Sequence, residues 1–398
     1  MLLISSFFWG WCSCSLLVCL KCFIYVNTLF LCVIVKLSCN GNGAIFLGHI
    51  ASQGSSLSYH FVVSERSNQI QLKLLQCGNC SLRTLVCHKR STGVIEQAKF
   101  VGCFKALAIA DACGACFEGG ALERALWYFV GKTSDGKLRY TDDTQMSIDV
   151  ANSFLANHTI DQNHLAKTFG NSYHWSRGYG PSAAKLLKGI HSGKDFNTLN
   201  KAKFKDGSKG NGAAMRAPVV AICNFISQAV LKEDITKTAE ITHAHPEAIE
   251  GAFLIARATQ LALIGVDKVG VMQTLCTEST LWPYKQKLVA CYKALTSSQP
   301  LDSYEIKHQF GNGMLSIDSV VTALYYAFSY RHKPLTQMIE DACSLGGDTD
   351  TICAMAGGIW GAYNGDATLN GFDQQIEGLE QISEIARNLH TRYVSLFS

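Results

Sequence analysis

The sequence is poor in proline and in charge: it has 6 prolines in 398 residues, and 17% of its residues are charged, whereas 48% are hydrophobic. A chain with so much apolar surface to bury is not a disordered one. The 17 cysteines follow no regular spacing, and their odd number argues against a disulfide scaffold and for a reducing compartment. No internal repeat with a period of roughly 20–50 residues is present, which argues against a solenoid.

Acidic residues are almost absent from the first 95 positions, where seven Lys and Arg residues face a single acid, Glu65. This segment has a net charge of +6, so the total of +4 leaves −2 for the rest of the chain. The body therefore has no basic surplus, and we expect no direct binding of nucleic acid.

Residues 1–38 are almost continuously apolar, and residues 40–95 are rich in Ser, Asn and Gly. A membrane anchor or signal peptide would account for the apolar part, but no basic region precedes it and no clear cleavage site follows. We favour a non-native extension. Residues 1–95 are thus expected to be an N-terminal extension without a predicted fold. The location is expected to be cytoplasmic, with nuclear or mitochondrial targeting and membrane contact left open.

Apolar residues recur at helical spacing from Gln97 onward, beginning with Phe100, Phe104 and Leu107. The same period predicts helices at 146–157, 182–191, 213–230, 236–265, 318–330, 335–344 and 352–363. No alternating strand pattern bounded by hairpin turns interrupts them. The fold class predicted for residues 99–398 is a single compact all-α domain of many helices.

Two acidic motifs precede helical patterns. The first is Tyr140-Thr141-Asp142-Asp143-Thr144, and the second is Gly346-Gly347-Asp348-Thr349-Asp350-Thr351. Each alone is most simply a helix N-cap, because Ser, Thr and Asp side chains satisfy the first free N–H groups of a helix.

If the two motifs meet, four carboxylates bring a charge of about −4 into a small volume, and two helix dipoles offset only about +0.5 each. Like charges near 4 Å repel by about 4 kcal/mol at an effective dielectric of 20. Two divalent cations would remove the conflict. Oxygen ligands without His or Cys select hard ions such as Mg²⁺.

Seven motifs occur in one order along the chain. They are Ala110-Asp111-Ala112-Cys113-Gly114 with Glu118, Tyr140-Thr141-Asp142-Asp143-Thr144, Arg177-Gly178-Tyr179-Gly180, Gly210-Asn211-Gly212-Ala213-Ala214-Met215-Arg216, Thr242-His243-Ala244, Phe310-Gly311-Asn312-Gly313, and Ser344-Leu345-Gly346-Gly347-Asp348-Thr349-Asp350-Thr351. In this order they resemble the ADP-ribosylglycohydrolase family, its ADP-ribosylhydrolase 3 type most of all. The resemblance runs from about Phe100 to the C-terminus.

The resemblance implies a site with two Mg²⁺ ions and an ADP-ribose pocket. The implied metal ligands are Glu118, Thr141, Asp142, Asp143, Asp348, Asp350 and Thr351. The implied catalytic carboxylates are Glu118, Asp142 and Asp143, and which of them acts as the base stays open. The residues implied to bind substrate are Asp142, Gly207, Ser208, Lys209, Gly210, Asn211, Gly212, His243 and Met314. Gly-rich backbone at a helix start suits phosphate oxygens.

The implied reaction is Mg²⁺-dependent hydrolysis of O-glycosidic ADP-ribosyl linkages, which releases ADP-ribose. The implied substrates and partners are ADP-ribosylated proteins (serine-linked first), poly(ADP-ribose) and O-acetyl-ADP-ribose. Two alternatives stay open: a hydrolase of ADP-ribosyl-arginine, and an inactive relative that binds ADP-ribose or is structural. The chain departs from the family pattern in three places: Ala110 replaces a usual Gly, Lys209 stands where an aromatic is more usual, and Tyr325-Tyr326 departs from what is expected after Gly311-Asn312-Gly313.

Other patterns have plainer interpretations. Cys77-Gly-Asn-Cys80 with Cys87-His88 resembles only half of a zinc site. His243 and His245 form an H-x-H pair more typical of a pocket or of packing than of a metal site. Arg216 is equally well a structural anchor or a ligand contact. The residues expected to be core are Cys113, Cys116, Tyr325, Tyr326 and Phe328.

Overall fold

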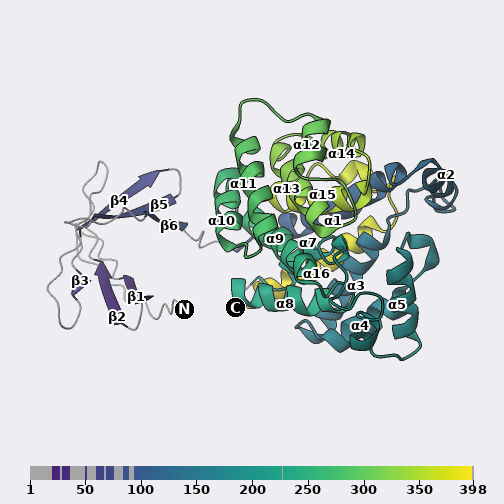
Figure 1. The fold of residues 1–398 in the computed structure, drawn as a ribbon, viewed down its shortest axis with the longest axis horizontal. Helices are drawn as coiled ribbons and strands as arrows, with labels where there is room; N and C mark the ends of the chain where they lie inside the picture. The colour runs from purple at the N-terminus through teal and green to yellow at the C-terminus, as the bar shows by residue number, and fades with distance from the viewer. Residues whose placement is uncertain are drawn as a thin grey trace. The chain divides into compact units, whose positions relative to one another are not determined.

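The computed structural model describes residues 94–225 and 227–396, together with six strands among the first 93 residues. Within residues 121–123 it describes the helix but not the side chains. The chain divides into two units, Met1–Gly93 and Val94–Ser398, and each is considered by itself (Figure 1).

The N-terminal unit contains two antiparallel three-stranded sheets. Strands β1 (Leu20–Val26), β2 (Leu29–Val35) and β3 (Ile50–Ala51) form one, with Phe23 opposite Cys32. Strands β4 (His60–Arg66), β5 (Gln69–Leu75) and β6 (Thr84–His88) form the other, with Val63 opposite Leu72. No fold was predicted for residues 40–95, and the structure shows that short β-branched runs in this segment form strands. Cys77 and Cys80 of the half zinc pattern lie outside the described residues.

The second unit is helical, as predicted, and its described residues contain no strand beyond isolated bridges. Its α-helices are α1 (Gln97–Gly114), α2 (Ala121–Val130), α3 (Asp142–Asn157), α4 (Gln162–Ser172), α5 (Pro181–His191), α6 (Phe196–Leu199), α7 (Ala217–Cys223), α8 (Gln228–Glu240), α9 (Pro246–Leu263), α10 (Lys268–Glu278), α11 (Trp282–Thr296), α12 (Ser303–Gln309), α13 (Ser316–Ser329), α14 (Leu335–Ser344), α15 (Thr349–Asn364) and α16 (Leu379–Val394).

Two of the helices predicted as continuous are interrupted in the structure. The segments 213–230 and 236–265 divide into α7, α8 and α9, with breaks at 224–227 and 241–245. Ser227 starts α8 as an N-cap that accepts a hydrogen bond from the Val230 N–H at 3.3 Å. Pro246 starts α9, and a proline restricts the preceding residue away from helical geometry. The second break carries His243, so it matters for the site.

Helices α1 and α15 pack on each other at the centre of this unit (Figure 1). A Cβ added at Gly361 of α15 would lie 1.9 Å from the carbonyl oxygen of Gly102 in α1, so only glycine permits this approach. The first turn of α15 meets the last turn of α1 as well. A Cβ at Gly114 would lie 2.8 Å from Asp350 Cα. The end of α1, and Glu118 after it, is thereby set beside the second acidic motif.

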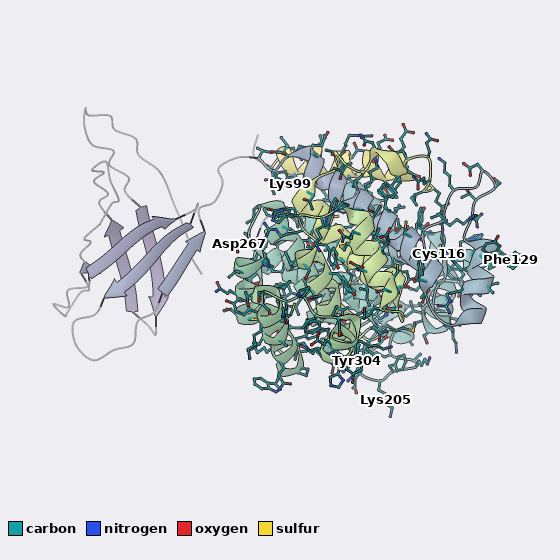
Figure 2. The ribbon with its side chains drawn as sticks, turned by 90° about the horizontal axis from the view of Figure 1, so that it is seen from above. Lys99, Cys116, Phe129, Lys205, Asp267 and Tyr304 are labelled. Carbon is teal, nitrogen blue, oxygen red and sulfur yellow. The ribbon has the colours of Figure 1, made fainter. Side chains whose placement is uncertain are left out.

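Among the described residues, one helical segment, Gln97–Phe117, is long and apolar enough to cross a membrane. Its most apolar window is 83% buried inside the fold, as in the central helix of a globular domain. Figure 2 shows Lys99 and Cys116 far apart along this segment.

Candidate metal centre

The first acidic motif forms the N-terminus of α3. Thr141 has extended backbone angles and accepts a hydrogen bond from the Asp143 N–H at 3.2 Å, so it is the N-cap. Asp142 and Asp143 occupy the first helical turn, where the helix dipole favours negative charge. The N-cap interpretation is therefore correct for this motif, and it does not exclude a further role.

A buried acid from α1 holds this N-terminus. Asp111 Oδ2 accepts from the N–H groups of Thr141 and Thr144, each at 3.0 Å. The Thr141 hydroxyl donates to Asp111 Oδ1 at 2.7 Å, and the Thr144 hydroxyl donates to Oδ2 at 2.5 Å. Burial raises the pKa of Asp111 to about 6, and these hydrogen bonds oppose the rise. Asp111 belongs to one of the seven motifs but had no predicted role; the signal that could have revealed it is an acid within a mostly apolar helix.

Arg177 of the Arg177-Gly178-Tyr179-Gly180 motif supports the same loop. Its guanidinium lies 3.9 Å from the centroid of the Tyr140 ring and donates to the Tyr140 carbonyl at 2.9 Å. It also forms an ion pair with Glu377. A Cβ at Gly178 would lie 4.0 Å from Asp142 Oδ1, so this motif borders the carboxylate.

The second acidic motif enters α15 through a turn of two glycines. Gly346 and Gly347 have φ angles of 65° and 83°, a region that L side chains rarely adopt. Asn312 forms hydrogen bonds at both ends of this turn. Its side-chain Nδ2 donates to the Gly346 carbonyl at 2.8 Å, and its backbone carbonyl accepts from the Asp348 N–H at 2.9 Å. A Cβ at Gly347 would lie 2.1 Å from Asn312 O. The Phe310–Gly313 motif thus positions Asp348.

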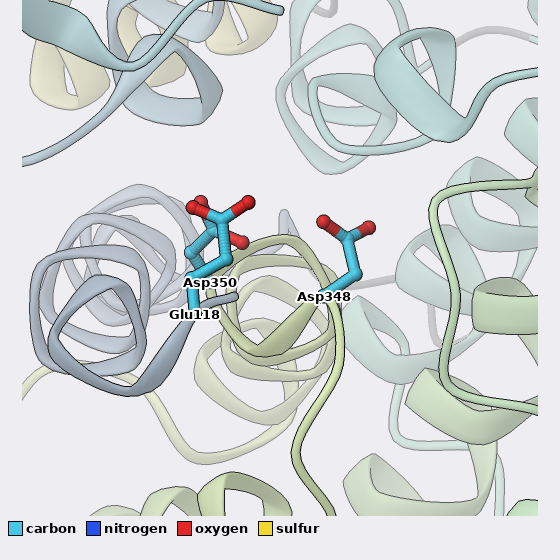
Figure 3. A group of neighbouring side chains, drawn as sticks. All are labelled: Glu118, Asp348 and Asp350. Carbon is cyan, nitrogen blue, oxygen red and sulfur yellow. The ribbon is translucent and has the colours of Figure 1, made fainter. Parts of the chain in front are cut away.

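The structure brings the two acidic motifs together. The Thr351 hydroxyl of α15 donates to Asp143 Oδ2 of α3 at 3.4 Å. Carboxylate oxygens of Glu118, Asp348 and Asp350 all lie within 4.8 Å of one another (Figure 3). This trio is the group in the described part of the chain with the spacing of a metal site. Figure 3 shows the carboxylates of Glu118 and Asp350 side by side, with Asp348 next to them.

The carboxylates at this centre are difficult to ionise together. Burial raises the pKa values of Asp142, Asp143 and Asp350 well above their ordinary range, and neighbouring acids raise them further. Burial also raises the pKa of Asp348 to about 7, with Glu118 adding to the rise and Asn211 opposing it. Such a concentration of negative charge is stable only with protons or cations between the carboxylates.

The donor set fits a hard metal ion. Asp143 is 1% exposed, and its Oδ1 is a buried acceptor without a hydrogen-bond partner in the described chain. A carboxylate oxygen in that position requires a donor or a cation. The surrounding ligands are oxygens of Asp, Glu and Thr, which prefer Mg²⁺ or Ca²⁺ to zinc. The acidic cluster can therefore hold a metal ion.

The Gly207–Gly212 loop borders the acidic centre. Asn211 donates from Nδ2 to Asp348 and, at 3.1 Å, to Ser319 Oγ. Gly210 and Gly212 face His243: an added Cβ would lie 3.1 Å and 2.4 Å from its ring. Ser208 and Lys209 belong to this loop, and Met314 lies against it.

Three further predicted substrate residues lie at the outside of this loop: Ser208, Lys209 and Met314. Ser208 Oγ accepts from the Gly210 N–H at 3.2 Å. Lys209 is exposed and pairs with Glu247 at 3.0 Å. Met314 is 64% exposed, and its carbonyl accepts from the Asn211 N–H at 3.0 Å.

His243 is held neutral. Burial, with Arg216 nearby, lowers the pKa of its imidazole to about 3. Its Nδ1 lies 2.8 Å from the Thr242 hydroxyl. His245 instead caps α9, with Nδ1 accepting from the Glu247 N–H at 3.1 Å. Among the described residues, neither histidine belongs to a group of three or more side chains with metal-ligand spacing.

Arg216 is an anchor: it is fully buried and donates to Gly212 O at 2.8 Å, Thr238 O at 2.7 Å and Thr242 Oγ1 at 2.9 Å. It therefore ties the glycine loop to the His243 turn. Of the two interpretations left open for Arg216, the contacts show the structural one.

The predicted core residues are confirmed with one exception. Tyr325, Tyr326 and Phe328 are buried, and Cys113 is half-buried against the core. Cys116 is exposed, so its assignment to the core was wrong. The reason is that α1 ends at Gly114, and Cys116 lies in the 3₁₀ turn that leaves the core (Figure 2).

The fold and the acidic centre define a helical protein with a site that can hold a metal ion. A family model described as ADP-ribosylglycohydrolase matches residues 93–396. The chain therefore belongs to the ADP-ribosylglycohydrolase family, and the enzyme class of that family is glycohydrolase.

Relatives agree with this assignment. The chain is 31% identical over 342 residues to ADP-ribosylhydrolase ARH3 of Danio rerio, covering 75% of this chain and 92% of the relative. It is 31% identical over 291 residues to ADP-ribosylhydrolase ARH3 of Homo sapiens, covering 64% and 78%. A solved structure described as an ADP-ribosylglycohydrolase-related protein complex matches with a TM-score of 0.56 at 21% identity, covering 75% of this chain and 98% of that one. That likeness concerns the fold alone.

Proposed function

We propose that this chain hydrolyses O-glycosidic ADP-ribosyl linkages and releases ADP-ribose. The proposed substrates are proteins ADP-ribosylated on serine, poly(ADP-ribose) and O-acetyl-ADP-ribose, and the proposed cofactor is a pair of Mg²⁺ ions. The observation that carries the proposal is the meeting of α3 and α15, which places Asp143 beside Thr351 and gathers Glu118, Asp348 and Asp350. The identity to relatives named ADP-ribosylhydrolase supports hydrolysis of an ADP-ribosyl linkage.

Two helix N-termini would supply most of the metal ligands. Thr141, Asp142 and Asp143 would act from α3, and Asp348, Asp350 and Thr351 from α15, with Glu118 joining them from the end of the 3₁₀ turn. Divalent cations, when bound, orient ribose hydroxyls, polarise the scissile bond and lower the pKa of an attacking water.

Two sets of residues would position the substrate. The Gly207–Gly212 loop would bind the diphosphate through those backbone N–H groups that have no partner within the chain, since the N–H groups of Gly207, Gly210 and Asn211 are already hydrogen-bonded. The absence of Cβ atoms at Gly210 and Gly212 lets the loop approach the His243 ring. His243 is neutral, so it would offer a hydrogen bond without adding charge. Asn211 would orient Asp348 from the same loop.

A carboxylate would accept the proton of the attacking water. The proposed catalytic carboxylates are Glu118, Asp142 and Asp143. Glu118 is half-buried and lies at the edge of the acidic cluster, where a carboxylate can meet both solvent and substrate. General-base catalysis requires such a group within hydrogen-bond reach of the water.

Release of ADP-ribose from serine-linked and arginine-linked peptides tests the proposal. We expect turnover of the serine-linked peptide in MgCl₂, loss of turnover in excess EDTA, and recovery when Mg²⁺ is added back. Turnover that chelation leaves unchanged would defeat the metal part. Preference for the arginine-linked peptide would defeat the O-glycosidic part, and binding of ADP-ribose with no turnover of either peptide would indicate an inactive relative.

A further inference from the structure

A cavity of about 530 Å³ lies outside the acidic centre, beside the start of the Gly207–Gly212 loop. Its walls come from the residues after α6, the segment before Gly207, the end of α8 and the start of α9. Its polar lining consists of Asn197, Asn200, Lys201, Lys205, Asp206, Glu240 and His245. This volume is in the range of small-molecule sites. The proposed function assigns no role to it.

Asn200 is fixed in place beside this cavity. The residue is 6% exposed, and its Nδ2 donates to the Glu240 carbonyl, which sets the orientation of the amide. Its Oδ1 has no hydrogen-bond partner in the described part of the chain, but this atom is closed to solvent and so does not face the cavity. The kind of ligand therefore follows from the charged side chains of the lining.

Three side chains offer donors to an anion. Lys201 and Lys205 are exposed, and neither forms an ion pair among the described residues. Figure 2 shows Lys205 reaching out at the edge of the unit. His245 accepts the Glu247 N–H on Nδ1, which leaves Nε2 as the donor of the ring. It also caps α9, an 18-residue helix whose N-terminus favours negative charge.

Two acidic residues of the lining offer acceptors. Asp206 and Glu240 bring carboxylates, and a carboxylate is the usual partner of ribose hydroxyls in nucleotide sites. Free phosphate would pair with the two ammonium groups but would be repelled by the two carboxylates. A neutral sugar would hydrogen-bond to the carboxylates but would not neutralise the ammonium groups. A ligand that carries phosphate on one side and hydroxyls on the other satisfies both sets.

We propose that this cavity binds a ribose phosphate group, such as the one in a second ADP-ribose unit. Asp206 lines the cavity and is the neighbour of Gly207, and Gly207 packs so closely on Ala244 and His245 that its Cβ would lie 2.6 Å from His245 N. The cavity and the glycine loop thus share one piece of backbone. A link to a polymeric substrate rests on the proposed function, whereas binding of ribose phosphate does not.

Calorimetric titration of the full chain with ADP-ribose in MgCl₂ tests this site. We expect two molecules per chain, and one after the double substitution Lys201→Glu with Lys205→Glu, with at least a 10-fold loss of affinity at the second site. Lys203→Ala is the matched control, because the Lys203 ammonium donates to Ser182 Oγ at 2.6 Å and does not line the cavity. One molecule per chain in the unsubstituted protein, or two in the double variant, would overturn the proposal.

Competition identifies the ligand class. We expect ribose 5-phosphate to displace the second molecule at a concentration at least 10-fold below that of inorganic phosphate. Asp206→Asn should weaken the binding of ribose 5-phosphate and leave the binding of inorganic phosphate unchanged. Equal potency of the two competitors would overturn the ribose part. Calorimetry does not depend on turnover, so two bound molecules without any hydrolysis would disprove the proposed function and leave this inference standing.

Discussion

Asn211 is the residue through which the glycine loop touches the acidic centre, because its Nδ2 donates to both Asp348 and Ser319. We expect Asn211→Ala to weaken Mg²⁺ binding by about 10–100-fold, since groups that orient metal ligands have effects of that size. Ser319→Ala is the control, because it removes the other partner and keeps the contact with Asp348. The measurement is the Mg²⁺ concentration for half-maximal release of ADP-ribose. The same value for Asn211→Ala and the unsubstituted chain would contradict the expectation.

Asp149 is a buried acid on α3 away from the proposed ligands. Burial raises its pKa to about 7, while hydrogen bonds from Ser172 and Gln145 and the charge of Arg216 oppose the rise. Because the folded state keeps this proton longer than the unfolded state does, stability falls as pH rises from about 4 to about 7. Asp149→Asn removes the titration and keeps an acceptor for Gln145.

We therefore expect Asp149→Asn to raise the free energy of unfolding relative to the unsubstituted chain, by roughly 1–3 kcal/mol at pH 8 and by much less at pH 5. Urea unfolding at the two pH values measures this. A difference that is the same at both values would show that Asp149 is not protonated in the folded state at low pH.

At the scale of elements, the turn into α15 depends on one of its two glycines. Gly347 has φ of 83° and no room for a Cβ beside Asn312, whereas Gly346 has φ of 65° and nothing within 4 Å of an added Cβ. We expect Gly347→Ala to shift Asp348 and to lower turnover by at least about 10-fold, by analogy with other changes that displace metal ligands.

Gly346→Ala is the matched control for this turn. It carries only the cost of a left-handed alanine, about 1–2 kcal/mol of stability. Turnover and the free energy of unfolding, measured for both variants, separate the two effects. Equal turnover in Gly346→Ala and Gly347→Ala would show that the contact with Asn312 does not position the site.

Sequence patterns located the helices better than they located the helix ends. The period of apolar residues is continuous through 236–265, but Pro246 restarts the helix, and the break places His243 next to Gly212. Cys116 shows the same limit, because nothing in its apolar surroundings reveals that α1 ends two residues earlier. Ends depend on caps and on neighbouring elements, which a local pattern does not contain.

At the scale of the whole helical unit, the acidic centre is a source of instability that a bound cation would remove. Carboxylates from α3, α15 and the segment after α1 repel one another, so metal binding should join these elements more firmly. A ligand present at 100 times its dissociation constant stabilises the folded state by about 2.7 kcal/mol. We expect MgCl₂ to raise the midpoint of thermal unfolding.

Asp143→Asn with Asp350→Asn is the comparison for this whole-molecule effect. It removes two of the repelling charges, so we expect a higher midpoint than the unsubstituted chain without Mg²⁺ and little further rise when Mg²⁺ is added. Differential scanning calorimetry in EDTA and in MgCl₂ measures both. A rise with Mg²⁺ of the same size in the two proteins would place the stabilising ion elsewhere.

The amino-acid sequence alone determined that the second unit is helical, because the period of its apolar residues is a local property. It also determined that Asp and Thr side chains stand together at two helix starts, and that the groups offered there are oxygens. It also carried the family motifs in order. Only the tertiary structure decided that Asp143 meets Thr351, that Asp111 and Asn312 hold the two acidic turns, and that Arg216 is an anchor. The contacts of Thr351, Asp111 and Asn312 join residues at least 30 positions apart. Gly102, Gly114 and Gly361 let α1 and α15 approach closely, which brings the end of α1 to the second acidic motif.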